Sequence, residues 1–259
     1  MTTPATQPWV REQLTLQEYP RSAGYEPQWM IDNVMGPNPV WLAEALAEEL
    51  PVSPGMRVLD LGCGRATTSI FLAKEFGARV WAADLWIAAT DNWQRVREAG
   101  AADEVFPLNA EAHALPFPDG FFDAIVSIDA YHYFGTAELY LSYLVRFLRP
   151  GGWLGIVVPG LVQELADDVP DHLRPYWEPD FFSLHSSEWW RGLWTRSGHV
   201  AVELADLIPD GWRHWVRWNE VCVAVGDAQW RDAASREAEM VRIDAGRTLG
   251  FVRVVARKP

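Results

Sequence analysis

The fold is most strongly limited by a regular alternation of short apolar segments and helical segments. Residues 121–130, FFDAIVSIDA, are nearly all apolar, as expected for a strand that is buried on both faces. Strands that alternate with helices pair in parallel through right-handed crossovers. The pattern therefore predicts an α/β fold with a doubly wound, mostly parallel sheet. Its first five strands are predicted at residues 57–62, 78–85, 104–110, 121–130 and 153–160, with helices between them at residues 66–76, 90–100 and 135–152.

The rest of the chain adds two strands and several irregular or helical stretches. Residues 199–208 and 249–258 read as the sixth and seventh strands, and residues 40–50 as a helix that precedes the sheet. Residues 160–198 and 209–245 interrupt the alternation. No repeat or low-complexity segment divides the sequence, so we expect a single domain over residues 1–259 with two insertions.

Charge and composition disfavour several classes of partner and site. The formal net charge is −13, which opposes binding to a nucleic-acid backbone or to an anionic membrane. No segment reaches the roughly 18 apolar residues of a membrane span, and no apolar leader follows basic residues at the start. Cys63 and Cys222 lie far apart, without a CxxC pair. We therefore expect a cytoplasmic protein that binds no nucleic acid, membrane or metal.

A glycine-containing turn follows the first predicted strand. In VLDLGCG, Gly62 and Gly64 stand where an open parallel sheet binds ligands, outside the carboxyl ends of its strands. A dinucleotide fingerprint needs a third glycine, but position 67 is threonine. Asp60 would repel a pyrophosphate and attract an amino group, whereas Asp84 can accept hydrogen bonds from a ribose diol. These residues favour a nucleoside that carries an ammonium group and no phosphates.

Four segments between Met56 and Pro159 together resemble the class I S-adenosylmethionine-dependent methyltransferases. VLDLGCG is similar to the first motif of that family, and Asp84 to its ribose-binding acid. EAHALPFPDGFFDAIVS, residues 111–127, resembles the stretch that ends in Leu-Pro-Phe before the fourth strand. FLRPGGWL, residues 147–154, resembles the turn before the fifth strand. Within the family, the likeness is to the small-molecule branch related to the ubiquinone and menaquinone methyltransferases.

The resemblance implies a Rossmann-like methyltransferase fold of seven strands, with S-adenosylmethionine as the cofactor. It implies an N-terminal helical lid over residues 1–50, a cofactor-binding half over residues 51–159 and substrate-side insertions at 160–198 and 209–245. Glu111 stands where the family usually has an aspartate that accepts from the adenine amino group. The implied cofactor contacts are Asp60, Gly62, Cys63, Gly64, Asp84, Leu85, Trp86, Glu111, Ala112 and Ser127.

The residues after the fourth strand are predicted to lie beside the transferred methyl group. Methyl transfer is an in-line displacement, and it is promoted by holding donor and acceptor at near-attack distance. A base is needed only if the acceptor must lose a proton. His132 is the one side chain of SIDAYHYFG that titrates near neutrality. We predict that His132 is a base or an acceptor contact; its alternative role is to anchor the loop.

The acceptor pocket is predicted to have aromatic walls, because the chain contains 15 tryptophans. Such walls can hold a cationic amine, whereas Arg213 could meet an acidic group. The acceptor, a small molecule, therefore stays open among nitrogen, oxygen and carbon. Core packing is the alternative role for many of these rings, above all for Trp212 at helical spacing from Trp215. The predicted pocket residues are Tyr25, Trp29, Asp129, Tyr131, Tyr176, Trp177, His185, Trp212 and Arg213, with Met35 and Asn38 as further lid candidates.

Two other functions use the same architecture. A nicotinamide-dependent oxidoreductase is disfavoured by Asp60 and by the absent third glycine. A non-catalytic S-adenosylmethionine-binding protein would differ from an enzyme in having no turnover to lose when His132 is replaced. A homodimer is the default oligomeric expectation, because cyclic dimers are the commonest assemblies.

Overall fold

The computed structural model describes residues 6–166 and 168–259. Residues 1–5 of the predicted lid and Asp167 of the first predicted insertion lie outside the described residues. The described chain contains a seven-stranded sheet in the order β3-β2-β1-β4-β5-β7-β6. Neighbours from β3 to β5 pair in parallel, whereas β7 runs antiparallel to both β5 and β6. The predicted doubly wound, mostly parallel seven-stranded sheet is thereby confirmed.

The elements follow one another as the alternation predicts. The strands are β1 Arg57–Leu61, β2 Arg79–Asp84, β3 Val105–Asn109, β4 Phe122–Ile128, β5 Leu148–Leu161, β6 Ala201–Leu207 and β7 Leu249–Arg257. The α-helices are α1 Thr6–Leu14, α2 Pro27–Asp32, α3 Pro39–Ala47, α4 Thr67–Phe76, α5 Ala89–Glu98, α6 Tyr140–Leu144, α7 Ser187–Ser197, α8 Gly211–Val225 and α9 Ala228–Asp244. Short 3-10 helices include η1 Ser22–Gly24 and η2 Tyr131–Tyr133. No described helix has both the length and the apolar character that a bilayer span requires.

Two apolar cores lie on the two faces of the sheet. Alternate residues of β1 belong to different cores: Val58 packs in the core with Phe71 of α4, and Leu59 in the core with Trp190 of α7. All four side chains are fully buried. Burial of each such side chain contributes about 1.5–3 kcal/mol relative to exposure. The strands are thus held from both sides, and their ends have fixed positions.

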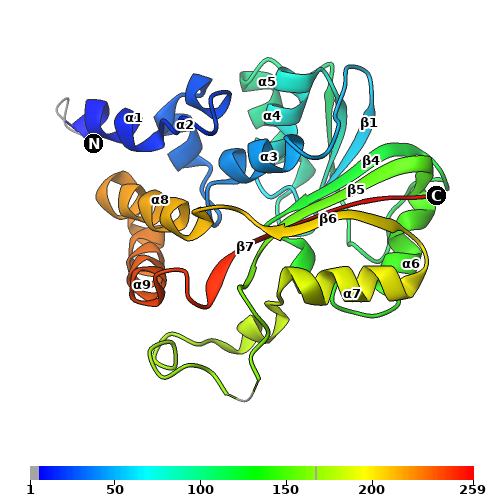
Figure 1. The fold of residues 1–259 in the computed structure, drawn as a ribbon. Coiled ribbons are helices and arrows are strands. Elements are labelled where there is room, and N and C mark those ends of the chain that lie inside the picture. The colour runs from blue at the N-terminus through cyan, green and yellow to red at the C-terminus, as the bar shows by residue number, and fades with distance from the viewer. Residues whose placement is uncertain (1–5, 167) are drawn as a thin grey trace.

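Helices α1, α2, α8 and α9 gather at one end of the sheet in Figure 1, away from the end where β7 and the chain terminate. Because β7 is antiparallel, its last residue marks the amino edge of the parallel strands, so these helices lie at the carboxyl edge. Trp218 Nε1 of α8 donates to the carbonyl of Gly36, 2.8 Å away. This bond ties α8 to the segment between α2 and α3.

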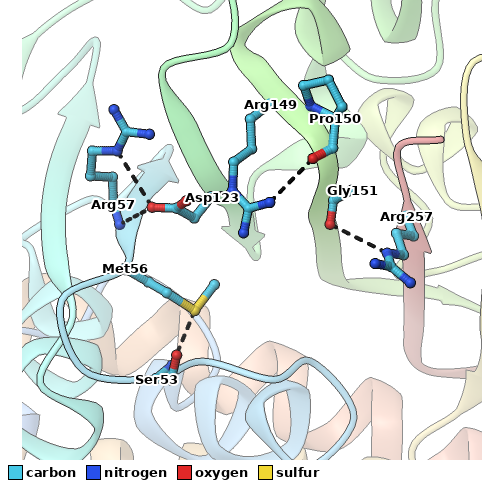
Figure 2. Close-up of polar contacts among 8 residues, drawn as sticks. All are labelled: Ser53, Met56, Arg57, Asp123, Arg149, Pro150, Gly151 and Arg257. Carbon is cyan, nitrogen blue, oxygen red and sulfur yellow. Dashed lines mark hydrogen bonds and ion pairs between the residues drawn. The ribbon is translucent and has the colours of Figure 1, made fainter.

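Arginines close the amino edge of the sheet around one aspartate, as Figure 2 shows. Asp123 Oδ2 accepts from the backbone N–H of Arg57 at 2.7 Å, and Asp123 Oδ1 from Arg149 Nε at 2.6 Å. Nearby, Arg257 Nε donates to the carbonyl of Gly151 at 3.3 Å. These bonds link the starts of β1, β4 and β5 to the end of β7, at the edge opposite the carboxyl ends.

Two segments differ from the sequence-based expectation. The helix predicted over residues 135–152 is only the short α6, followed by a 3-10 turn and by β5 from Leu148. A Cβ on Gly135 would lie 2.0 Å from the ring of Tyr131, so only glycine allows this close approach at the start of the predicted helix. Near the start of the chain, which the sequence analysis assigned to a helical lid without placing a helix there, α1 buries Val10 and Leu14.

Candidate active site

A cavity of about 340 Å³ opens at the carboxyl ends of β1, β2, β3 and β4. This is the switch point of the sheet, because β1 continues to β2 on one side and pairs with β4 on the other. The segment that joins α2 to α3 closes the cavity from outside the sheet. Its lining includes Asn33, Met35, Gly36, Pro37, Pro39, Gly62, Cys63, Gly64, Arg65, Thr67, Thr68, Asp84, Leu85, Trp86, Glu111, Ala112, His113, Asp129, Ala130, Tyr133 and Phe134.

The glycine turn after β1 forms the floor of the cavity. Gly62 has φ +76° and Gly64 has φ +53°, a region that side-chain-bearing residues rarely adopt. A Cβ on Gly62 would stand 2.3 Å from the Cβ of Ala130, which follows β4. The turn after β1 therefore touches the turn after β4, and only glycine permits that approach.

Asp84, at the end of β2, is already engaged with the backbone around the cavity. Its Oδ2 accepts from the N–H of Gly64 at 2.8 Å, and its Oδ1 from those of Trp86 and Ile87 at 2.8 and 2.9 Å. A carboxylate offers about four acceptor positions, so roughly one remains, on Oδ2. In this arrangement Asp84 has room for one ribose hydroxyl, whereas the sequence suggested a pair.

Asp60 is buried beneath the glycine turn and is absent from the cavity lining. Its Oδ2 accepts from the hydroxyls of Thr68 and Ser69 on α4, while its Oδ1 has no partner among the described residues. Burial raises the pKa of Asp60 to about 6, against the lowering effect of the two hydroxyls. The sequence predicted that Asp60 contacts the ligand. In the structure α4 covers the carboxyl group of Asp60, so this residue does not line the cavity.

The end of β3 contributes Glu111 and Ala112 to the lining, as the resemblance implied. His113 lies beside them, and its Nδ1 is 2.7 Å from Glu111 Oε1. This hydrogen bond lowers the pKa of the Glu111 carboxyl group. Ser127, also a predicted cofactor contact, is fully buried and donates to the carbonyl of Leu61 at 2.7 Å. Ser127 therefore joins β4 to β1 below the cavity and does not line it.

After β4, only some of the side chains face the cavity. Asp129, Ala130, Tyr133 and Phe134 line it. Tyr131 points instead into the core, where its ring lies 5.6 Å from that of Trp190. His132 is 4% exposed, is not part of the lining, and its Nδ1 has no partner among the described residues. Burial lowers the pKa of His132 to about 4, so its ring is neutral at physiological pH.

Seven other residues that the sequence predicted for the acceptor pocket lie away from the cavity. Tyr25 and Trp29 pack together on α4, and the Tyr25 hydroxyl donates to Glu75. His185 stacks on Trp189, with ring centroids 3.6 Å apart. The other four residues also contact side chains outside the cavity. Tyr176 packs against Arg236, and Trp177 against Phe181. Trp212 packs against Arg213, which forms an ion pair with Asp210.

Several lining residues were not predicted. Met35 was a lid candidate, but Asn33, Gly36, Pro37 and Pro39 were not predicted individually. For the last three, the signal was the run GPNP directly before a helix, where the chain must reverse close to the sheet. Arg65, Thr67 and Thr68 follow the glycine turn and could have been found from their place at the start of α4.

The chemistry of the lining suits a cationic nucleoside and opposes a pyrophosphate. Asp84, Glu111 and Asp129 contribute carboxyl groups, whereas Arg65 Nη1 already donates to the carbonyl of Asp32 at 2.7 Å. Trp86 is 72% exposed at the cavity and offers a free face for an aromatic base. These residues fit S-adenosylmethionine, which carries a sulfonium and an ammonium group and no phosphate.

The comparisons with known proteins agree with this fit. Residues 58–152 match the family model described as a methyltransferase domain. The chain is 36% identical over 135 residues to the methyltransferase GfsG of Streptomyces halstedii, covering 49% of this chain and 48% of GfsG. It is 34% identical over 180 residues to the uncharacterized protein Rv1405c of Mycobacterium tuberculosis, covering 68% and 61% of the two chains.

A solved structure shares the fold. Phosphoethanolamine N-methyltransferase 2 of Haemonchus contortus, in complex with S-adenosyl-L-methionine, superposes with a TM-score of 0.74 at 20% identity, covering 96% of this chain and 60% of that one. The chain spans less than two thirds of the length of each of these three proteins. The matched segment contains β1 to β4, the glycine turn and most of the cavity lining. Residues 58–152 of the chain therefore contain a methyltransferase domain.

Proposed function

We propose that this chain transfers a methyl group from S-adenosylmethionine to a small molecule. The observation that carries the proposal is the cavity at the sheet's switch point, with its glycine floor and its carboxyl groups, inside the methyltransferase domain. We also propose that the chain is related to the ubiquinone and menaquinone methyltransferases, because residues 111–127 and 147–154 resemble that branch.

The residues of the cavity have separate roles in this proposal. Asp84 holds a ribose hydroxyl through Oδ2, and Glu111 with Ala112 meets the adenine ring. The turn from Gly62 to Gly64 lies against the methionine end. When bound, the cofactor supplies an electrophilic methyl group on a sulfonium. The chain's own contribution is to orient the two reactants and, through residues 33–39, to exclude water.

Calorimetric titration tests the cofactor assignment. We expect wild-type protein to bind S-adenosylmethionine and S-adenosylhomocysteine and to ignore NADH and NADPH. Asp84→Ala removes a charged acceptor, so the affinity for both adenosyl compounds is expected to fall about 10- to 100-fold. Asp103→Ala, which removes an exposed carboxyl group away from the cavity, is the matched control. Tight NADH binding, or no binding of the adenosyl compounds, contradicts the proposal.

The role of His132 is tested by separating turnover from binding. We keep it as a predicted acceptor contact, although its ring is buried in this structure. If His132 contacts the acceptor, His132→Gln lowers kcat for a methylated substrate and leaves S-adenosylhomocysteine affinity unchanged. If it only anchors η2, the variant changes thermal stability and leaves kcat unaltered. A panel of small amines, phenols and carboxylic acids, analysed by mass spectrometry, supplies the substrate.

A further inference from the structure

Asp129 lines the cavity just after β4, and its carboxyl group has no hydrogen-bond partner among the described residues. It directly follows β4, and its backbone N–H donates to the carbonyl of Val157 at 2.8 Å. Its φ is +54°, a left-handed conformation that residues with a side chain rarely adopt. Among the described residues, its side chain forms no hydrogen bond or ion pair, and it lines the cavity. The fold thus fixes a carboxyl group at this position and leaves its oxygens available.

A second carboxyl group reinforces the negative potential at Asp129. Glu237 of α9 is partly buried and accepts at Oε2 from Trp215 Nε1 and Asn219 Nδ2, both at 3.0 Å. Burial, and then the charge of Glu237, raise the pKa of Asp129 well above its usual value. Burial likewise raises the pKa of Glu237. A cation that bound at Asp129 would relieve this repulsion, whereas an anion would add to it.

The segment before α3 encloses this end of the cavity. A Cβ on Gly36 would lie 2.3 Å from Asp129 Oδ2, so the chain passes over the carboxyl group at a distance that only glycine allows. Tyr133 lies on the same lining with 56% of its surface exposed, and the charge of Asp129 contributes to the raised pKa of its hydroxyl. A small cation at this place would meet a carboxyl group and an aromatic ring together.

The order of the strands places this site beside the transferred methyl group. The proposed adenine, ribose and methionine contacts follow β3, β2 and β1, and β4 is the next strand of the sheet. We propose that Asp129 binds the methyl acceptor and that this acceptor is a primary or secondary amine. The inference rests on the proposed function and names the substrate class of the same site.

The chemistry balances with the groups that are present. The amine binds as an ammonium ion and gives one proton to the Asp129 carboxylate. The freed nitrogen lone pair then forms a bond to the methyl carbon, and the carbon–sulfur bond breaks with its electron pair remaining on sulfur. The product leaves as a methylated ammonium ion, and Asp129 returns its proton to solvent. A carboxyl group whose pKa is raised toward that of the amine is suited to accept this proton.

Sinefungin tests the site without the acceptor, because it carries an amine on carbon where S-adenosylmethionine carries the methyl sulfonium. We expect calorimetry to show sinefungin binding at least 10-fold more tightly than S-adenosylhomocysteine to the wild type. Asp129→Asn should reduce the ratio of the S-adenosylhomocysteine Kd to the sinefungin Kd to about one. It should keep the affinity for S-adenosylhomocysteine within two-fold. Glu237→Gln, which keeps an acceptor for Trp215 and Asn219, should reduce the ratio several-fold. Asp103→Asn is the control and should keep it.

The failures are distinguishable. Absence of S-adenosylhomocysteine binding to the wild type overturns the proposed function. Normal binding of that compound with no preference for sinefungin, or a preference that survives Asp129→Asn, overturns only the role of Asp129. A competition among benzylamine, benzyl alcohol and benzoic acid tests the substrate class. Preferred methylation of the amine supports it, and preferred methylation of the alcohol or acid overturns it.

Discussion

At the scale of single residues, Asp60 and Asp84 show how differently one residue type acts at neighbouring strand ends. Asp84 points into the cavity and organises the backbone N–H groups around it. Asp60 sits beneath, where Thr68 and Ser69 bond one oxygen and the other has no described partner. Asp60 therefore affects the stability of the fold, because a buried carboxylate is costly when ionised.

The pH dependence of stability should report Asp60. Its folded pKa of about 6 exceeds the value of 3.8 for a free carboxyl group, so the folded state holds the proton more tightly. Its contribution is full below pH 3.8 and is lost as pH rises through 6. Two pKa units correspond to about 3 kcal/mol. Measured by urea unfolding from pH 4 to pH 8, wild type should lose up to that amount relative to Asp60→Asn. If the free energy of unfolding changed with pH in the same way in wild type and Asp60→Asn, this would contradict the raised pKa of Asp60.

At the scale of elements, the N-terminal segment is fastened through Glu44 of α3. The two oxygens of this buried carboxyl group accept from the backbone N–H groups of Arg21 and Ser22, at 2.8 and 2.7 Å. These residues lie at η1, between α1 and α2, and the chain continues from there into the segment that closes the cavity. Glu44 thereby links the closure of the cavity to the body of the sheet.

Glu44→Ala should loosen this closure. The substitution leaves two N–H groups without an acceptor, at a cost of about 1–3 kcal/mol for each that stays buried. We expect faster hydrogen exchange at Arg21 and Ser22 and a several-fold faster release of S-adenosylhomocysteine in stopped-flow experiments. Glu12→Ala, at an exposed position of α1, serves as the control. Unchanged exchange in the Glu44 variant would mean that other contacts hold the segment.

The floor and the walls of the cavity differ in how far the sequence predicts them. The floor of the cavity could be predicted, because VLDLGCG and Asp84 act through turns that follow their own strands. The acceptor walls could not be predicted, because their positions depend on contacts between distant segments. His172 bonds Asp244, and His185 bonds Glu164, and none of residues 162–166 and 168–186 is part of the lining. Gly36 lines the cavity, and its carbonyl accepts a hydrogen bond from Trp218, which lies far along the chain.

At the scale of the whole molecule, Arg253 joins the antiparallel end of the sheet to the helical layer. This arginine of β7 is 6% exposed. Its Nη1 donates to the carbonyl of Ala45 in α3 at 2.7 Å, and its Nε and Nη2 meet both oxygens of Asp206 in β6 at 3.1 and 2.7 Å. One side chain thus connects β6, β7 and α3.

Removing one partner of this ion pair should destabilise the entire fold. Breaking a buried pair costs about 3–5 kcal/mol, and Asp206→Ala should fall at the lower end because this aspartate is partly exposed. The loss should appear as a lower urea midpoint with an unchanged slope. Asp119→Ala removes the partner of an exposed arginine and should change stability by less than about 1 kcal/mol. Equal effects of the two substitutions would contradict the assigned role of Arg253.

The position of β7 has a consequence for how the protein is made. This last strand fills the place between β5 and β6, and it pairs with both along most of its length. A nascent chain emerging from the ribosome can assemble β1 to β5, but β6 has no place in the sheet until β7 has also emerged. The sheet therefore closes only after β7 has been translated, and a message truncated before codon 249 yields a protein in which β5 exposes an open edge.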